Sequence, residues 1–246
     1  MTIDIPAMKR LWQQAFGDEM AVIDGFFATG FDKTRCQCLY EDSLLAAALY
    51  WFDCLWQGQK VAYIYAVATE KGFRGKGLCR RLMEKTHIHL QKQGYVGAVL
   101  VPGSPALFAM YEKFGYRGFF PGTVTQVTAG KKDIALRKLS LTEYLTQRLQ
   151  YIPENSVVAG KEAFSYLATY GAFYEGAQGI FCFARQKDTI YFQEYLADLK
   201  HLPDVVKTLE AETGVLRLSG AGEKQAMYRS FTDNTALPSY FAPALD

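Results

Sequence analysis

Three glycines and a run of basic residues stand together in EKGFRGKGLCRRLMEK, at residues 70–85. An apolar, strand-like segment precedes this stretch, and a pattern typical of an amphipathic helix follows it. The N–H groups of a helix's first turn have no partner inside the helix, and the helix dipole attracts negative charge to that end. Gly75 and Gly77 would let the backbone come close to a ligand there. The stretch therefore predicts a loop that binds phosphate through backbone N–H groups.

Positive charge is local rather than general in this chain. The formal net charge is only +2, whereas seven Lys or Arg residues stand against one acidic residue between Lys71 and Lys92. Three of the seven lie at the glycines: Arg74, Lys76 and Arg80. A solvent-exposed helix face would explain the charge alone, but the glycines favour a site for one anionic ligand. Nothing in the balance indicates a general nucleic-acid or membrane-surface binder.

Two common phosphate-binding motifs do not fit this loop. A Walker loop has four residues between its first glycine and its Gly-Lys pair, but only two residues separate Gly72 from Gly75. A dinucleotide-binding fingerprint has a third glycine three residues after the second, where this chain has Arg80. Neither motif therefore identifies the phosphate ligand of this loop.

The apolar periodicity of the first half changes repeatedly between helix and strand. Helices are predicted at 8–16, 18–27, 78–90 and 104–114, and strands at 35–40, 44–56, 61–69, 95–101, 116–120 and 123–128. Strand–helix–strand units place strands in parallel, and hairpins place them antiparallel. This order predicts the α/β class, with a mixed sheet that carries helices on both faces.

The second half repeats this order more loosely. AGKKD at 129–133 is a reasonable boundary, and helices, a hairpin at 179–196, a helix near 202–213 and further strands follow it. The segment ADLKHLPDV, where strand changes to helix in this half, contains no glycine. We therefore predict two domains, residues 1–128 and 132–246, of which only the first contains a phosphate-binding loop.

Two short motifs in residues 1–128 resemble one known family. Arg74, Gly77 and Cys79 form Arg-x-x-Gly-x-Cys, which resembles the Gln/Arg-x-x-Gly-x-Gly/Ala signature of the Gcn5-related N-acetyltransferase (GNAT) superfamily. Tyr111-Glu112-Lys113-Phe114-Gly115-Tyr116 is similar to the Tyr-x-Lys-x-Gly-Phe/Tyr run of the family's closing helix. Cys79 departs from the signature, but its side chain is small. The second half is only topologically similar, as in tandem members with one degenerate copy.

The resemblance implies an acyl-CoA N-acyltransferase fold in two tandem GNAT-like halves, a catalytic domain at 1–128 and a degenerate one at 132–246. It implies transfer of an acetyl group from acetyl-CoA to a primary amine by direct attack, with Tyr111 protonating the leaving thiolate. The amide of Val67 or of a neighbour would polarise the thioester carbonyl, and the strand would bind the pantetheine arm. The residues implied in coenzyme A binding are Val67, Ala68, Thr69, Arg74, Gly75, Lys76, Gly77, Leu78, Cys79 and Arg80.

The general base and the acceptor site stay open. Glu70, Tyr63 and Tyr65 are candidate bases, although the two tyrosines could equally be core residues, and a water-relayed base or no base is equally compatible. A terminal carboxylate could also reach a site in a compact tandem fold. His87 and His89 are two positions apart on a helix, so we expect structural or exposed roles for them. Aromatic residues of the first two helices belong to the core or line an apolar acceptor pocket: Trp12, Phe16, Phe26, Phe27 and Phe31.

The remaining sequence features bear on location and partners. The five cysteines are odd in number and irregular in spacing, and no histidine cluster completes a metal site, so we expect reduced thiols and no metal. No signal peptide begins the chain and no apolar run reaches the ~18–20 residues of a membrane span, which predicts a cytoplasmic protein. The expected partner is a small-molecule or peptide amine, without nucleic acid or membrane, and the chain could form a homodimer. A non-catalytic acyl-CoA sensor and a donor other than acetyl-CoA are the alternatives.

Overall fold

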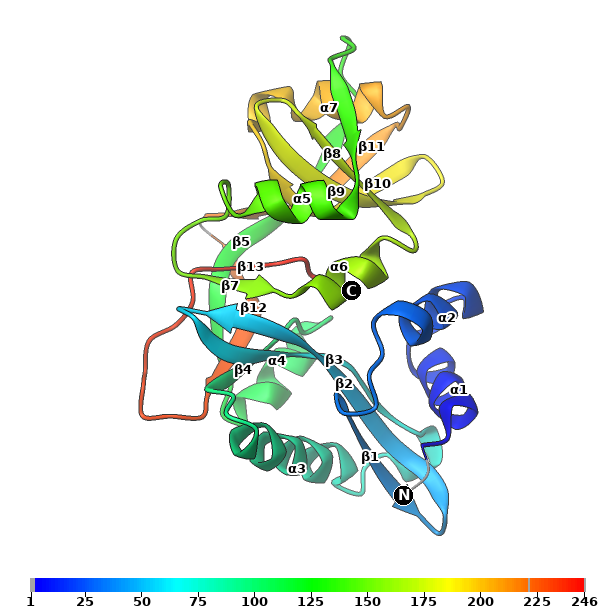
Figure 1. The fold of residues 1–246 in the computed structure, drawn as a ribbon. Helices are drawn as coiled ribbons and strands as arrows, with labels where there is room; N and C mark the ends of the chain where they lie inside the picture. The colour runs from blue at the N-terminus through cyan, green and yellow to red at the C-terminus, as the bar shows by residue number, and fades with distance from the viewer. Residues whose placement is uncertain (1–2, 221, 246) are drawn as a thin grey trace. The chain divides into compact units, whose positions relative to one another are not determined.

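The computed structural model describes residues 3–220 and 222–245, which fold into two compact units (Figure 1). The first unit consists of Met1–Gly118 and Ala226–Leu237, and the second of Phe119–Gln225 and Pro238–Asp246. This division differs from the predicted boundary at 129–133. The difference arises because a segment from late in the chain belongs to the first unit, which no local sequence signal could indicate.

The described residues of the first unit form four α-helices and a short 3₁₀-helix: α1 (Ile5–Phe16), α2 (Met20–Thr29), η1 (Lys71–Phe73), α3 (Leu78–Lys92) and α4 (Pro105–Glu112). Local caps determine several of their ends. Asp4 accepts a hydrogen bond from the N–H of Ala7 at the start of α1, and Gly17 ends that helix with φ 76°. Ser104 caps α4 in the same way by accepting from the N–H of Leu107.

Five strands form the sheet of the first unit in the order β1-β2-β3-β4-β12. Their bounds are β1 (Cys36–Glu41), β2 (Leu44–Trp56), β3 (Gln59–Thr69), β4 (Gly97–Leu100) and β12 (Glu223–Ser230). Only β3 and β4 run parallel, and every other neighbouring pair in this order is antiparallel. The predicted mixed α/β sheet is therefore confirmed.

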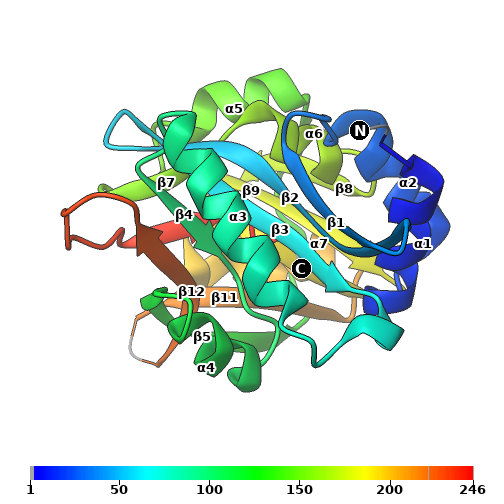
Figure 2. The same cartoon turned by 90° about the horizontal axis from the view of Figure 1, so that it is seen from below.

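Helices cover both faces of this sheet, as the sequence predicted. Figure 1 shows α1 and α2 on one side of strands β1–β3 and α3 on the other, and Figure 2 shows α3 lying across the strands. Alternate residues of β2 face opposite sides: Trp51 packs in the cluster that contains Leu82 of α3, and Tyr50 contacts Trp12 of α1. This alternation is the two-residue period of a strand with both faces buried.

Within the second unit the strands follow the order β5-β11-β10-β9-β8-β6, and β7 and β13 form a short parallel pair. The strands are β5 (Arg117–Thr128), β6 (Leu136–Leu139), β7 (Ser156–Ala159), β8 (Gly171–Gly176), β9 (Gly179–Gln186), β10 (Thr189–Leu196), β11 (Thr213–Ser219) and β13 (Tyr240–Ala242). The helices are α5 (Leu141–Arg148), α6 (Lys161–Leu167), η2 (Leu199–His201) and α7 (Leu202–Thr208). The two strands predicted at 116–120 and 123–128 form one strand, β5, with a left-handed φ of 54° at Phe120.

The two units repeat one arrangement. An antiparallel hairpin (β2-β3 or β9-β10) is followed by a helix and then by a strand (β4 or β11) that lies parallel to the second strand of the hairpin. In each unit the register of the hairpin shifts within that second strand. Within 3–220 and 222–245, none of the helices has the length and apolar character needed to cross a bilayer.

Candidate functional site

Strand β3 separates from β4 at a bulge. The two strands pair only from Val61 opposite Gly97 to Tyr63 opposite Val99. Beyond this point β3 has one more residue than β2 in the same interval, and Ala66 takes a left-handed φ of 48°. The end of β3 therefore has a backbone edge that β4 does not pair with. This edge contains three residues that the sequence assigned to ligand binding: Val67, Ala68 and Thr69.

The glycine loop, residues 74–77, follows β3 and the 3₁₀-helix η1. Glu70 caps η1 by accepting a hydrogen bond from the N–H of Gly72 at 2.7 Å, and Arg74 Nε donates to the carbonyl of Thr69 at 3.0 Å. Gly75 and Gly77 have φ values of 76° and 74°, and a Cβ at either position would have no heavy atom within 4 Å. The glycines are therefore required for the left-handed backbone and not for lack of space.

The N-terminus of α3 opens directly after this loop. Gly77 is its N-cap, and no side chain caps the helix. The first N–H groups of α3 therefore have no intrahelical acceptor. The basic side chains around them are all exposed to solvent: Arg74, Lys76 and Arg80. A helix N-terminus with free N–H groups and nearby cations is suited to bind a phosphate or pyrophosphate.

Cys79 does not disturb this geometry. It is the second residue of α3 and is partly buried against the apolar cluster of the first unit. Its backbone is not among the left-handed positions of the described residues, so a glycine is not required here. Burial raises the pKa of the thiol, which is therefore protonated at neutral pH.

Tyr111 lies on α4 and is only 6% exposed. Its ring packs edge-on against Phe114 and Tyr116, with centroids 6.0 and 5.8 Å apart. Burial, with a smaller contribution from the nearby Cys79, raises the pKa of the Tyr111 phenol. Among the described residues its hydroxyl has no hydrogen-bond partner. The side chain is therefore a neutral O–H donor that could serve an incoming group.

One apolar cluster joins these parts. It contains Leu78 from the start of α3 and Tyr111 from α4, and Val67 of β3 and Cys79 pack against it. The structure thus brings together the strand edge, the helix N-terminus and the phenol that the sequence singled out separately.

The candidate general bases occupy structural positions. The carboxylate of Glu70 is the cap of η1, and its N–H donates to the carbonyl of Ala46 at 2.9 Å. Tyr63 is 1% exposed and packs against Phe52, and Tyr65 packs edge-on against Trp12. Asp246, which would supply the terminal carboxylate, lies outside the described residues.

The aromatic residues of the first two helices form core packing. The centroid of the Trp12 ring lies 4.8 Å from that of Phe26 and 5.4 Å from that of Tyr50. Its Nε1 donates a hydrogen bond to the Asp18 carboxylate at 2.7 Å. Only Phe16 is largely exposed, at 48%. The sequence left two possibilities for these residues, core packing or the lining of an acceptor pocket. Trp12 and Phe26 therefore belong to the core.

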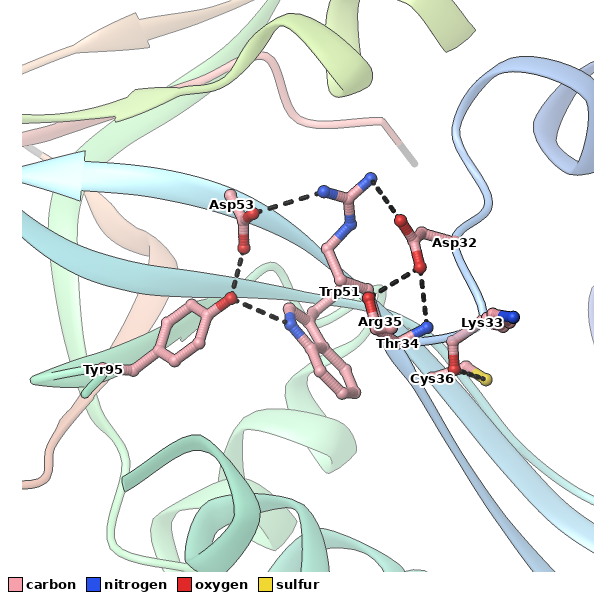
Figure 3. Close-up of polar contacts among 8 residues, drawn as sticks. All are labelled: Asp32, Lys33, Thr34, Arg35, Cys36, Trp51, Asp53 and Tyr95. Carbon is pink, nitrogen blue, oxygen red and sulfur yellow. Dashed lines mark hydrogen bonds and ion pairs between the residues drawn. The ribbon is translucent and has the colours of Figure 1, made fainter. Parts of the chain in front are cut away.

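A polar network that the sequence did not indicate ties the loop after α2 to the sheet (Figure 3). Asp53 of β2 accepts hydrogen bonds from Arg35, at 3.2 Å, and from the Tyr95 hydroxyl, which in turn accepts from Trp51 Nε1 at 3.4 Å. Asp32 accepts from both the N–H and the hydroxyl of Thr34, which lowers the pKa of its carboxyl. These contacts hold the segment between α2 and β1 in one conformation.

A second unpredicted cluster surrounds His87. Its Nε2 lies 2.9 Å from the Tyr116 hydroxyl and its Nδ1 lies 3.0 Å from the guanidinium of Arg229. Burial, together with the neighbouring Arg229, lowers the pKa of His87 to about 3. The imidazole is therefore neutral, and it accepts from Arg229 through Nδ1. His87 has the structural role expected for it, but its partner comes from β12.

The second unit has no equivalent of the glycine loop. Strands β10 and β11 pair from Thr189 opposite Thr213 to Phe192 opposite Leu216 and then separate, with the register shift at Gln193. The cavity between them has a volume of about 170 Å³ and is lined partly by the last residues of the chain, among them Tyr240, Phe241 and Ala242. Here η2 runs directly into α7, and a proline occupies its first turn. The strands thus separate as in the first unit, but the described residues between β10 and α7 contain no glycine loop.

Known proteins resemble this chain at two levels. The sequence model of the acetyltransferase (GNAT) domain matches residues 2–119, and no curated protein matches the chain. A Gcn5-related N-acetyltransferase from Anabaena variabilis has a TM-score of 0.67 and 15% identity, covering 93% of this chain and 70% of its own. The corresponding enzyme from Kribbella flavida has a TM-score of 0.63 and 15% identity, with 94% and 71% covered. A tandem GNAT protein from the clavulanic acid biosynthesis pathway has a TM-score of 0.57 and 10% identity, with 94% and 95% covered.

The structural matches share too little sequence identity with this chain to show more than a common fold. The family is indicated by the match to the domain model. Residues 2–119 therefore form a domain of the GNAT acetyltransferase superfamily.

Proposed function

We propose that this protein is an acetyl-CoA-dependent N-acetyltransferase whose first unit transfers an acetyl group to a primary amine. The observation that carries the proposal is the convergence of three parts on one cluster: the unpaired edge of β3, the open N-terminus of α3 and the buried phenol of Tyr111. Each part corresponds to one requirement of the reaction, which needs a held donor, a polarised carbonyl and a protonated leaving group.

Each part of the site has a separate role in the proposed reaction. The N–H groups from Gly75 to Arg80 would bind the pyrophosphate, with Arg74 and Lys76 adding positive charge. The edge of β3 at residues 67–69 would hydrogen-bond the pantetheine arm like an added strand, and an amide at Val67 would polarise the thioester carbonyl. The amine nitrogen attacks the carbonyl carbon, the new C–N bond forms, and the C–S bond breaks, while the nitrogen loses one proton to solvent water, from which Tyr111 is later reprotonated. Tyr111 gives its hydroxyl proton to the departing thiolate.

The second unit is proposed to be a degenerate copy that does not bind the donor. Two observations support this: the loop between β10 and α7 has no glycine cradle, and residues 240–242 lie against the space between the separated strands. A seven-residue α7 with a proline in its first turn offers little dipole for a phosphate.

Calorimetric titration with acetyl-CoA, ATP and NAD tests the donor, and thiol release over a panel of amines tests the reaction. Binding of acetyl-CoA alone, with amine-dependent thiol release, is the expected result. Binding without release by any amine would favour a sensor that keeps only the donor site. Competition by succinyl-CoA and propionyl-CoA identifies the acyl group, and failure of every acyl-CoA to bind would overturn the proposal.

A further inference from the structure

A cavity of about 170 Å³ lies in the second unit where β10 and β11 separate. The two strands pair as far as Phe192 opposite Leu216, and beyond this point β11 stays paired with β5. Residues 240–242 also line the space. We call it the β10–β11 cavity. All the residues that line it belong to the second unit, so it is distinct from the proposed donor site of the first.

Gln193 is the extra residue of a bulge in β10. Phe192 pairs with Phe183 of β9 and Glu194 pairs with Cys182, so no residue of β9 lies opposite Gln193. A bulge changes the direction of the side chain that it carries, and Gln193 lines the cavity. Its carbonyl oxygen Oε1 is buried and has no hydrogen-bond partner among the described residues. The bulge thus leaves one buried acceptor at the cavity without a donor.

A buried acceptor without a donor lowers the stability of a protein. Burying such an oxygen without a hydrogen bond costs about 1–3 kcal/mol, because the bond that water would give is lost. Buried polar atoms are therefore nearly always paired with protein groups, water or a ligand. Oε1 of Gln193 is in this sense prepared for a molecule that brings an O–H or N–H group into the cavity.

The carboxylate of Glu194, which also lines the cavity, has no such vacancy. It accepts hydrogen bonds from two guanidinium nitrogens of Arg148 at 2.6 and 2.7 Å, from the Tyr144 hydroxyl at 2.9 Å and from the Tyr240 hydroxyl at 3.3 Å. These four bonds use the acceptor positions of both carboxylate oxygens, and Arg148 balances the negative charge. Gln193, and not Glu194, is therefore the acceptor that a ligand would meet.

The size and the lining of the cavity indicate which ligand fits. An apolar cavity of about 150 Å³ in another protein holds one benzene molecule, so a volume of about 170 Å³ suits a single ring with a small substituent. Phe120, Phe192 and Phe241 belong to the lining, and aromatic rings pack favourably against one another. The two charged residues of the lining, Glu194 and Arg217, have opposite charges, which favours a neutral ligand.

We propose that the β10–β11 cavity binds a small neutral aromatic molecule whose single O–H or N–H group donates to Oε1 of Gln193. Phenol is the simplest compound of this class, and toluene has nearly the same shape without the donor. The inference goes beyond the proposed function and does not depend on acetyl-CoA binding, because the cavity lies in the second unit.

The test is titration of the full chain with phenol and with toluene, followed by NMR of the nitrogen-15-labelled protein. Phenol should shift the signal of the Gln193 side-chain amide, because the carbonyl of that amide gains a hydrogen bond. Toluene should bind in the same place and shift the signal less. This comparison uses the native protein, so it does not depend on whether a variant folds.

The Gln193→Met variant keeps the length of the side chain and removes the acceptor. It should weaken phenol binding about tenfold and change toluene binding by less than about twofold, as the loss of one hydrogen bond allows. Gln186→Met is the matched control, since Gln186 is an exposed glutamine of β9 that does not line the cavity. Thermal unfolding verifies the fold of both variants.

Every other outcome overturns the inference. Failure of both compounds to bind would show that water alone occupies the cavity. An equal loss of phenol and toluene affinity in Gln193→Met would show that the substitution changes the shape of the cavity and not a hydrogen bond. Tighter binding of benzoate than of phenol would assign the cavity to an anion beside Arg217. None of these outcomes changes the acetyl-CoA titration, which decides the proposed function separately.

Discussion

Arg229 donates a hydrogen bond to Nδ1 of His87 over 3.0 Å, although 142 positions separate the two residues in the chain. The same guanidinium also donates to the carbonyl of Phe114, at the end of α4. One side chain of β12 therefore connects α3 with the end of the helix that carries Tyr111. The geometry of the first unit depends in this way on a segment that follows most of the second.

His87 should make the stability of the protein depend on pH. Its pKa is about 3 in the folded protein and 6.5 in the reference state, so the unfolded chain binds the extra proton between these values. The contribution of neutral His87 to the free energy of unfolding is therefore fully present above pH 6.5. It is lost as the pH is lowered towards 3, by at most about 1.4 kcal/mol per pH unit. Urea unfolding at pH 7 and pH 5 should show this loss in the native protein and less of it in His87→Gln. His89→Gln is the control, and an equal pH slope in all three proteins would contradict the prediction.

Tyr111→Phe should lower kcat about 100-fold and leave KM for acetyl-CoA nearly unchanged, because the phenol acts on the leaving group and not on the bound donor. The ring remains, so the packing against Phe114 and Tyr116 is kept. Steady-state kinetics measure the effect, and thermal unfolding verifies the fold. Tyr151→Phe, at an exposed position of the second unit, is the matched control. Unchanged kcat in Tyr111→Phe would remove the proposed proton donor.

Gly77→Ala should destabilise the protein by about 1–2 kcal/mol, because an alanine Cβ is strained at a φ of 74° even where space is open. Acetyl-CoA binding should weaken at the same time, since the substitution changes the loop that would hold the pyrophosphate. Gly77→Asn should lose less, because asparagine tolerates the left-handed region. Gly103→Ala is the control: its Cβ also meets open space, and its φ is not left-handed. Equal losses at the two glycines would refute the argument from φ.

Glu194→Gln should cost about 3–5 kcal/mol of stability, because it leaves the Arg148 guanidinium buried without its counter-ion. The side chains of this pair are 1% and 0% exposed, and Glu194 also accepts from Tyr144. Glu175→Gln changes an exposed partner of Arg137 in the same unit and should cost less than about 1 kcal/mol. Chemical unfolding of both variants gives the comparison. Similar losses in the two would show that burial does not set the cost.

Local features of the fold could be predicted because short-range forces decide them. The helices α1, α3 and α4 follow from apolar periodicity, with side-chain caps at α1 and α4, and the strands β2 and β3 follow from apolar and aromatic runs with a turn between them. The glycine loop was recognisable for the same reason, since a left-handed φ at Gly75 and Gly77 is a property of the backbone at those positions. The short strands β6 and β7 were missed, because each pairs with a strand that lies far away in the chain, and β8 was missed although it forms a hairpin with β9.

The sequence by itself determined the family resemblance of the first half, the position of the glycine loop and the tyrosine of α4 that shares a cluster with the start of α3. Only the tertiary structure decided that β3 and β4 separate after Tyr63, that β12 completes the first sheet, and that Gln193 and Tyr240 line one cavity. Helix periodicity and glycine conformation are set by neighbours within a few residues. Strand pairing and side-chain clusters instead depend on which distant segments share a sheet or a core, and no local pattern records that choice.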